Sequence, residues 1–410
     1  MSTVDLDPFD VNARIPHEMH QEMRSTCPVA RIPVGWFLTR HAEVLLAVRD
    51  VETFQSSYRE PGVIVPEEEQ ILPEIPEPRH GRVRRLVNAV LAHHKAMRVE
   101  PFIRDLSYEY LEPLLDRGEG DLVAEYASPI PINVIAHMIG VPRADWPLFR
   151  QWSDEVVQGD YVNKNRTDRG EGFGGGHPEF AAYVDDLIAV RKASAERPDD
   201  LVTRLLYTKI EGDHLTDLEI RTQLISLILG GNETTRHLIA NVLARVVEDP
   251  ALLQTLKADP SRCAQAVEES LRIDPPIHQM LRTVAATTDR FGPEMCPGEK
   301  IIYAVASANR DEDVFDDPED FRLERANGRD HLAFGDGPHI CPGQAIARLE
   351  ARVTLEVFVE RVATAATRPG WTYRKVPIFW ANGPIDLDVR LTPEPSSPEP
   401  SPPGSQDGLR

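Results

Sequence analysis

Hydrophobic residues recur along most of the chain at the three- and four-residue intervals that place them on one face of a helix. This periodicity predicts helices over residues 16–25, 42–48, 80–91, 103–115, 130–139, 145–157, 178–195, 215–248, 251–257, 262–273 and 344–362. Strand-like segments are fewer and lie at 29–33, at 35–39 and, alternating with turns, between 281 and 306. The pattern therefore indicates a mostly helical chain.

The longest helical pattern spans residues 215–248 without interruption. Thr216 is a suitable N-cap, and Glu219 three residues later completes a capping box. At about 1.5 Å per residue such a helix is roughly 50 Å long, which is enough to cross the whole molecule.

Three segments break the helical pattern. Residues 58–78 are rich in Pro and Glu, and residues 159–176 are rich in Gly and polar side chains. Loops of this length in a compact chain usually act as lids or binding loops, so we expect lids here. Residues 393–410 are rich in Pro, Ser and Glu and are predicted to be a disordered tail.

Composition narrows the class of protein. The 410 residues are 41% hydrophobic and 27% charged, which is typical of a globular protein, and no apolar run is long enough to predict a membrane span. The net charge of −21 opposes general nucleic-acid binding. The four cysteines have no paired spacing, and the first residues lack the basic start and apolar core of a signal peptide. A cytoplasmic location without disulfides or a zinc cluster is therefore expected.

Cys341 lies in the sequence Phe-Gly-Asp-Gly-Pro-His-Ile-Cys-Pro-Gly at 334–343, directly before the amphipathic run 344–362. Glycine and proline at this density form a tight, rigid turn. The cysteine therefore stands at the start of a helix, where the macrodipole and free backbone N–H groups stabilise a thiolate. A thiolate in a stiff loop suits the axial ligation of iron, whereas the alternative for an isolated cysteine is a buried, inert side chain.

Together with the Ile-Ala-Arg at 346–348, this string resembles the haem-ligand loop of the cytochrome P-450 family. Fixed residue types at fixed spacing rarely coincide by chance, so the resemblance outweighs the inert-cysteine alternative. It implies that Cys341 holds the iron of haem b, and that Phe334, Gly335 and Gly343 belong to the cofactor loop.

The resemblance covers residues 7–391 and implies one mainly α domain with the cytochrome P-450 fold, in which a large helical part joins a smaller β-rich part. The haem would lie between the long central helix and the helix after the Cys loop. Residues 393–410 would follow as a tail. This implication replaces the two or three average domains that the length alone permits.

A second motif, Leu-Gly-Gly-Asn-Glu-Thr-Thr, occupies 229–235 in the middle of the long helix. Two glycines in a helix interior cost about 1 kcal/mol each relative to alanine, and they let the helix bulge and a small ligand approach the backbone. On these residues alone, glycine packing beside a solvated glutamate is an equally good explanation. The segment resembles the family's oxygen-activation motif, which implies that Thr234 is the hydroxyl beside iron-bound oxygen and Glu233 the acid of a proton relay.

Glu269 and Arg272 stand three residues apart in the predicted helix 262–273. Such a pair is usually a surface contact that contributes little to stability. It resembles the family's Glu-x-x-Arg pair, which implies a structural role in a buried cluster whose third member is Arg325.

Four basic residues resemble the family's contacts to the haem propionates. His80 and Arg84 share one helix face through their spacing of four, Arg282 follows the Glu-x-x-Arg helix, and His339 lies in the Cys loop. Each alone is typical of a surface cation, but together with Cys341 they favour a haem site.

The resemblance also implies a substrate pocket. Its lining would consist of Ser226, Leu229, Gly230, Ile277, His278, Phe379 and Trp380. These residues and the predicted lids are mostly apolar or flexible, so we expect a hydrophobic small molecule. The Asn-Glu-Thr-Thr-Arg form is similar to bacterial members that oxidise steroids, terpenoids or fatty chains, and secondary metabolites belong to the same chemical range.

The implied reaction inserts one oxygen atom of O2 into this molecule. No dinucleotide glycine fingerprint and no cysteine cluster occur in the sequence, so the electrons are expected from a separate ferredoxin with its reductase. Residues 79–98 contain no acid, and we predict that this basic patch docks the acidic carrier. Its cations are Arg79, Arg82, Arg84, Arg85, Lys95 and Arg98, with His93 and His94 among them.

Two other functions fit a haem-thiolate centre. A peroxygenase driven by hydrogen peroxide is the closer one, but such relatives lack the acid–alcohol pair that Glu233 and Thr234 form. A non-catalytic haem sensor would need no proton relay, no lids and no docking surface. The monooxygenase hypothesis is therefore preferred.

Overall fold

The computed structural model describes residues 4–56, 65–91, 97–158 and 177–395. The predicted lid at 159–176 lies outside the described residues, as do 57–64 of the other predicted lid and the part of the predicted tail beyond residue 395. Among the described ranges, no helix is both long enough and apolar enough to cross a membrane.

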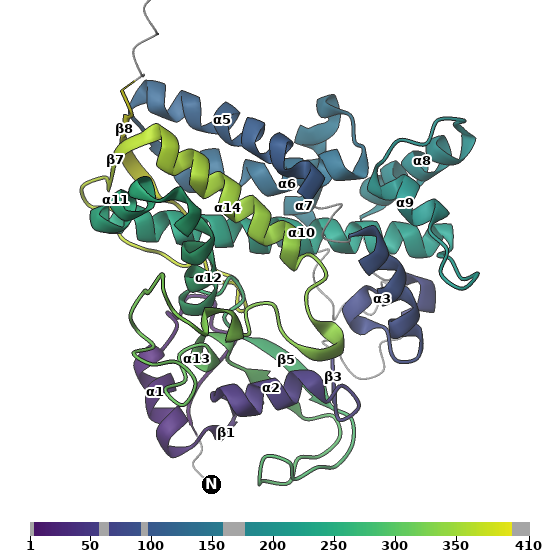
Figure 1. Cartoon of the computed structure of the whole chain (residues 1–410). Coiled ribbons are helices and arrows are strands. Elements are labelled where there is room, and N and C mark those ends of the chain that lie inside the picture. The colour runs from purple at the N-terminus through teal and green to yellow at the C-terminus, as the bar shows by residue number, and fades with distance from the viewer. Residues whose placement is uncertain (1–3, 57–64, 92–96, 159–176, 396–410) are drawn as a thin grey trace, which may run out of the picture.

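Helices make up most of the described chain (Figure 1), as the hydrophobic periodicity predicts. The α-helices are α1 (His17–Thr26), α2 (His41–Arg49), α3 (Arg79–Val90), α5 (Glu100–Arg117), α6 (Pro129–Ile139), α7 (Trp146–Gln158), α8 (Pro178–Ala193), α9 (Leu201–Tyr207), α10 (Asp217–Glu248), α11 (Pro250–Ala258), α12 (Cys263–Ile273), α13 (Val305–Ala308) and α14 (Gln344–Arg361). Each predicted helix has a counterpart here. The short helices α9 and α13 were not predicted, because one or two turns show no clear period.

Short helical turns connect these elements. They are η1 (Glu67–Glu69), η2 (Leu72–Glu74), η3 (Met97–Val99), η5 (Arg143–Asp145), η7 (Pro260–Arg262), η8 (Gly328–Asp330) and η9 (Gly337–His339), with one π-helical turn, η4 (Val123–Ala127). Two of them, η1 and η2, lie in the segment 58–78 that the sequence predicts to be an unstructured loop. Single 3-10 turns of this kind form around prolines and leave no periodic signal.

The strands form two sheets. The larger has the order β1 (Val29–Ile32), β2 (Gly35–Leu38), β6 (Lys300–Tyr303), β5 (Met280–Val284) and β3 (Phe54–Gln55), and only β2 and β6 pair in parallel. The smaller has the antiparallel order β4 (Glu119–Asp121), β8 (Asp388–Pro393) and β7 (Val362–Thr367). The sequence predicted β1, β2, β5 and β6. It missed the other four, which are very short or pair with segments far away in the chain.

The ordered C-terminus extends further than predicted. Pro393, which the sequence assigns to the disordered tail, ends β8 and pairs with Val362 of β7. The backbone N–H of Glu394 donates to the carbonyl of Arg361 over 2.7 Å, and its carboxylate forms an ion pair with Lys257. The boundary therefore lies beyond residue 391, because strand pairing continues past it.

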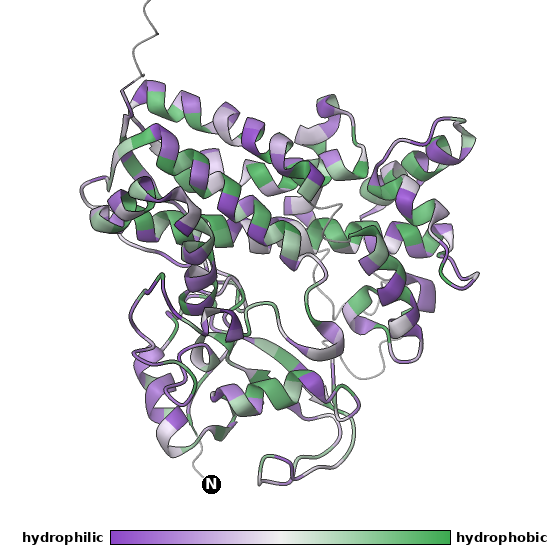
Figure 2. Cartoon of the chain, in the orientation of Figure 1, coloured by the Kyte–Doolittle hydropathy of each residue, from purple (hydrophilic) through white to green (hydrophobic). Residues whose placement is uncertain are grey.

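Helix α10 crosses the molecule and supports the site. Its predicted cap is confirmed: the Thr216 hydroxyl accepts from the backbone N–H of Glu219 at 3.2 Å, and the Glu219 carboxylate accepts from the N–H of Thr216 at 3.0 Å. Its buried face packs against α6 and α14, and α14 packs in turn on α5 (Figure 1). Figure 2 shows hydrophobic residues along the length of α10. The large core therefore fixes α10 and α14 relative to one another.

A second, smaller core lies between α2 and the five-stranded sheet. Trp36, Phe54 and Ile301 are buried there, at 3%, 0% and 0% exposure. In Figure 1 this β-rich part lies below α10 and α14, and the loop that leads into α14 passes between the two parts. The site described below lies in that region.

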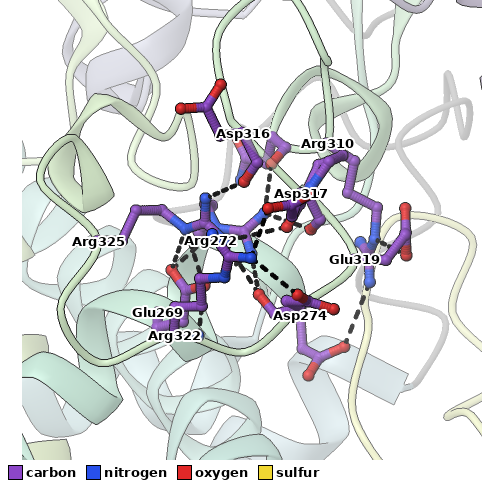
Figure 3. A network of polar contacts seen from close by, with 12 residues as sticks. Glu269, Arg272, Asp274, Arg310, Asp316, Asp317, Glu319, Arg322 and Arg325 are labelled. Atoms are coloured by element: carbon purple, nitrogen blue, oxygen red, sulfur yellow. Dashed lines mark hydrogen bonds and ion pairs between the residues drawn. The ribbon is translucent and has the colours of Figure 1, made fainter.

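Glu269, Arg272 and Arg325 meet in a buried cluster (Figure 3). The Glu269 carboxylate accepts from Arg272 at 2.7 and 2.9 Å and from Nε of Arg325 at 3.0 Å. Glu269 is 2% exposed and Arg272 is 0% exposed, so this is no surface pair. The remaining N–H groups of Arg272 donate to the backbone carbonyls of Asn309, Pro318 and Asp320. Every nitrogen of its guanidinium therefore donates to an acceptor, as a buried charge requires.

Candidate active site

A cavity of about 360 Å³ lies between the middle of α10 and the loop that carries Cys341. Its walls come from both the helical and the β-rich parts, and most of its lining side chains are apolar. The structure places these predicted site residues on its wall: Arg84, Ser226, Gly230, Thr234, Ile277, Arg282, Phe334, Gly335, His339, Cys341 and Gly343. These residues come from four separate stretches of the sequence, and folding brings them to one cavity.

The Cys loop owes its shape to glycines. Gly335 and Gly337 have φ angles of +68° and +67°, a left-handed conformation that favours glycine. A Cβ atom on Gly337 would also lie 3.1 Å from Cα of Arg49 in α2, so the loop packs tightly against that helix. The backbone N–H of Cys341 donates to the carbonyl of Phe334 over 2.9 Å, which closes the turn and directs the cysteine to the cavity.

The electrostatics of Cys341 differ from the expectation. Burial raises the pKa of its thiol, although the backbone N–H groups of Gly343 and Gln344 and the charges of Arg84 and Arg348 act in the opposite direction. The helix start therefore helps a thiolate but does not produce one unaided. Because a metal cation bound to the sulfur deprotonates a thiol outright, a metal at Cys341 would favour the thiolate.

Basic residues also line the cavity. Arg84 donates to the carbonyl of Ile340, while Nε and Nη1 of the buried Arg282 have no hydrogen-bond partner among the described residues. Burial and the nearby charges of Arg282, His80 and Arg84 lower the pKa of His339 to about 3. Buried donors without acceptors indicate a site for an anionic group. This donor set suits the propionates of haem, and Cys341 suits its iron.

His80 does not line the cavity, although it lies next to the residues that do. Its ring packs against that of His339 in a tilted arrangement, with centroids 4.3 Å apart, and its Nδ1 lies 2.9 Å from the carboxylate of Glu77. Its Nε2 is buried and has no partner among the described residues. His80 therefore contacts the wall residue His339 without lining the cavity itself.

The motif at 229–235 reaches the cavity wall through Gly230 and Thr234. The Thr234 hydroxyl donates to the carbonyl of Gly230 over 2.7 Å. A Cβ atom on Gly230 would meet nothing within 4 Å, whereas one on Gly231 would lie 3.4 Å from Ile135. Glycine at 230 thus leaves the helix backbone open to the cavity. The bulge that the sequence suggested is absent, since α10 is α-helical throughout this described stretch.

Glu233 points elsewhere. It is 1% exposed, it is not part of the cavity wall, and its carboxylate pairs with Arg236 and His237 of the same helix. The solvated glutamate of the alternative interpretation is therefore excluded. Burial raises the pKa of Glu233, but His237 and Arg236 outweigh that effect and lower it overall.

Four predicted pocket residues are not on the wall: Leu229, His278, Phe379 and Trp380. The backbone explains three of them. The segment around Ala381 pairs with Ile277, the N–H of His278 donates to the carbonyl of Trp380, and Gln279 donates to the carbonyl of Phe379. The Phe379 ring packs on Phe9, at 5.2 Å between centroids. These contacts hold the C-terminal turn against the N-terminal segment instead of the cavity.

Glu350 was missed by the sequence analysis. It lines the cavity from α14, is 3% exposed, and its Oε2 has no partner among the described residues. Burial raises its pKa well above the ordinary value, which favours the protonated form of the carboxyl group. The available signal was an acid between Leu349 and Ala351 on the buried face of an amphipathic helix.

The predicted basic patch is largely neutralised. Arg79 and Arg82 pair with Glu219 at the start of α10, Arg82 also pairs with Asp213, and Arg98 pairs with Asp199. Arg85 is exposed, whereas Arg84 faces the cavity. Lys95, His93 and His94 lie outside the described residues. The prediction of a strongly basic surface was wrong for most of its arginines, because the partner acids lie more than a hundred residues away in the sequence.

Known proteins resemble this chain over nearly its whole length. The family described as cytochrome P-450 matches residues 263–365. A "Steroid C26-monooxygenase" of Mycolicibacterium smegmatis is 33% identical over 384 residues, which are 92% of both proteins. A "Cytochrome P-450 109" of Bacillus spizizenii is 31% identical over 85% of this chain and 84% of its own length.

Solved structures give the same result. CYP109Q5 from Chondromyces apiculatus superposes with a TM-score of 0.83 and 30% identity, covering 94% of this chain and 98% of that one. CYP109E1 from Bacillus megaterium in complex with testosterone superposes with a TM-score of 0.81 and 28% identity, covering 92% of this chain and 99% of that one. The fold and the chain length therefore agree with those of these proteins.

Proposed function

Because the chain belongs to the cytochrome P-450 family and is a haem b monooxygenase, we propose that it hydroxylates a hydrophobic small molecule of the steroid type with electrons from a separate ferredoxin. The observation that supports this best is the cavity itself. Cys341 and Thr234, which lie on different elements, both line it. Its remaining wall is mostly apolar, which suits a ligand with few polar groups.

Steroids are the proposed substrates for two reasons. One relative is named as a steroid monooxygenase, and two superposing structures contain testosterone or corticosterone. Most side chains that line the cavity are also apolar, so binding would depend mainly on apolar surface.

Cys341 would hold the haem iron, and Arg84, Arg282 and His339 would bind the propionates, with His80 behind them. When bound, haem supplies the oxygen-activating chemistry, and the protein provides orientation, electrostatics and proton delivery. Thr234 would hold and pass a proton at its hydroxyl on the cavity wall, and Glu233, whose carboxylate is held by Arg236 and His237 in this structure, would be the acid of the relay. The apolar wall would exclude bulk water.

Titration with testosterone tests the proposal. We expect a shift of the haem from low to high spin, followed by a hydroxylated product when ferredoxin, its reductase and NADPH are supplied. Product formation with hydrogen peroxide alone, at the rate of the full electron-transfer system, would instead support the peroxygenase alternative. Absence of both the shift and the product for a panel of steroids would contradict the proposed substrate class.

Replacing Thr234 with alanine is expected to leave haem and testosterone binding intact but to divert electrons to hydrogen peroxide. A lost proton-transfer group commonly lowers a rate by about a hundredfold or more, and here product per NADPH should fall accordingly. Thr234→Ser is the matched control, because it keeps the hydroxyl that donates to Gly230. Equal coupling in the wild type and Thr234→Ala would show that this hydroxyl has no part in proton delivery.

The carrier would dock near α3, where Arg85 is the exposed arginine of the helix. We expect Arg85→Glu to slow the first electron transfer, and the wild-type rate to fall as salt is raised, because exposed charges are screened over about 8–10 Å near physiological ionic strength. Arg368→Glu, which makes the same charge change in the exposed turn after β7, is the control. Equal rates for the two variants would place the docking site elsewhere. Arg82 is unsuitable as a probe, because it is paired with Glu219.

A further inference from the structure

A short segment of the cavity wall is held in place from outside the cavity. It follows α12 and reads Asp-Pro-Pro-Ile at 274–277, and its last two residues, Pro276 and Ile277, line the cavity. Pro275 and Pro276 are buried and have no backbone N–H, so their carbonyls are the polar backbone groups that need partners here. The donors to these carbonyls therefore determine where this part of the wall lies.

Two asparagines bind three successive carbonyls of the segment. Nδ2 of Asn241 on α10 donates to the carbonyl of Asp274 over 2.9 Å. Asn382 of the C-terminal segment donates twice. Its Nδ2 donates to the carbonyl of Pro275 over 3.2 Å, and its backbone N–H donates to that of Pro276 over 2.8 Å. Each of the three carbonyls thus has a donor, as buried backbone requires.

The two asparagines are also bonded to each other. Nδ2 of Asn241 donates to the backbone carbonyl of Asn382 over 3.0 Å, so the helix and the C-terminal turn hold the wall segment together. Asn241 is 4% exposed and Asn382 is 5% exposed. Replacing such a buried amide with an apolar side chain leaves its acceptors unpaired, which destabilises the arrangement that the amide maintains.

One face of α10 anchors both the turn and the wall segment. His237, Asn241 and Arg245 lie four residues apart and therefore share that face. A Cβ atom on Gly383 would lie 2.2 Å from Nδ1 of His237, so the backbone of the turn packs directly on the helix. At the other end, Nε of Arg245 lies 2.7 Å from the carboxylate of Asp274. The wall segment therefore begins at a fixed point on α10.

The C-terminal turn acts on the cavity only through this segment. The described residues 376–383 contribute nothing to the cavity wall. Ala381 pairs with Ile277 in an antiparallel bridge, and the N–H of His278 donates to the carbonyl of Trp380 over 2.9 Å. A shift of the turn would therefore move Ile277, and with it the apolar surface that a ligand meets.

We propose that Asn241 and Asn382 are positioning residues for ligand selection, because they fix Ile277 on the wall without lining the cavity themselves. The inference rests on the proposed binding of a hydrophobic molecule in this cavity. The position of an apolar wall matters, because one methylene group gained or lost in a hydrophobic pocket changes affinity by about tenfold or more. Asn241→Leu and Asn382→Ala should therefore bind haem but differ from the wild type in the apolar ligands that they accept.

The test uses imidazole and 4-phenylimidazole, which require only a haem-loaded cavity. Imidazole needs little room beside the iron, whereas the phenyl group of the larger ligand must fit against the wall. Titrations followed at the Soret band give a dissociation constant for each ligand, and their ratio separates the wall from ligation of the iron. We expect the ratio to change about tenfold in Ile277→Ala and at least about threefold in Asn241→Leu and Asn382→Ala.

Asn133→Leu is the matched control. Asn133 is 3% exposed, its amide donates to the hydroxyl of Tyr110, and it does not line the cavity. This variant should lose stability much as Asn241→Leu does, but it should keep the wild-type ratio. A merely structural role of Asn241 would lower the melting temperature of both variants and leave both ratios unchanged. Asn382→Ala keeps the backbone N–H to Pro276 and decides the question if Asn241→Leu binds no haem.

Wild-type ratios in Asn241→Leu and Asn382→Ala would overturn the proposal. An unchanged ratio in Ile277→Ala would also overturn it, because Ile277 would then have no part in ligand selection. An equal change in Asn133→Leu would show that any lost buried amide has this effect, which contradicts a specific role of Asn241. Failure of the wild type to bind testosterone would contradict the proposed steroid class alone, since the two imidazoles test the wall independently.

Discussion

Replacing Glu269 with alanine is expected to lower the free energy of unfolding by about 3–5 kcal/mol, because the buried guanidinium of Arg272 is then left without its carboxylate. That is a large part of the stability of an ordinary domain, so the variant should bind little haem. Urea unfolding followed by circular dichroism, together with the haem content, measures both effects.

The matched control is Glu109→Ala, which removes an exposed partner of Arg143. Such surface pairs contribute about 1 kcal/mol or less, so this variant should unfold close to the wild type. Glu269→Gln keeps the volume of the side chain and should remain folded if the alanine variant does not, with a smaller loss. Equal midpoints for the Glu269 and Glu109 variants would show that the cluster of Figure 3 contributes no more than a surface contact.

Replacing Cys341 with serine is expected to abolish the red-shifted Soret band of the reduced, carbon monoxide-bound protein and to stop product formation. A serine oxygen lacks the electron donation that a thiolate gives to haem iron. Cys296→Ser is the control, since Cys296 is exposed and does not line the cavity, and it should keep the band. Cys341→His offers a nitrogen ligand in case the serine variant binds no haem, and it should show an unshifted band. A red-shifted band in both Cys341 variants would mean that another residue holds the iron.

Local sequence predicts the parts of the site whose geometry is local. The capping box at Thr216, the long helix and the turn around Cys341 all depend on residues within a few positions of one another. Glycines with left-handed φ angles at 335 and 337 explain why the turn could be predicted. The same holds for Gly230, whose missing side chain leaves the backbone open to the cavity.

The errors concern contacts between distant segments. Phe379 and Trp380 were expected in the pocket, but pairing of Ala381 with Ile277 turns that loop toward the N-terminal segment. Likewise, the acids that neutralise the basic stretch at 79–98 come from residues near 200 and 219, so a count of charges along the chain cannot detect them. The direction of Glu233 depends on its ion pairs with Arg236 and His237, which the family motif does not specify.

Glu219 shows how a change far from the ligand can alter ligand binding. Its carboxylate closes the cap of α10 and also holds Arg79 and Arg82 of α3, the helix that places Arg84 on the cavity wall. One buried side chain that does not line the cavity therefore links the two helices that supply two of its walls. A mutant library confined to the cavity lining would omit this position, although substitutions there should widen substrate range, and their effects should be non-additive with those of wall residues.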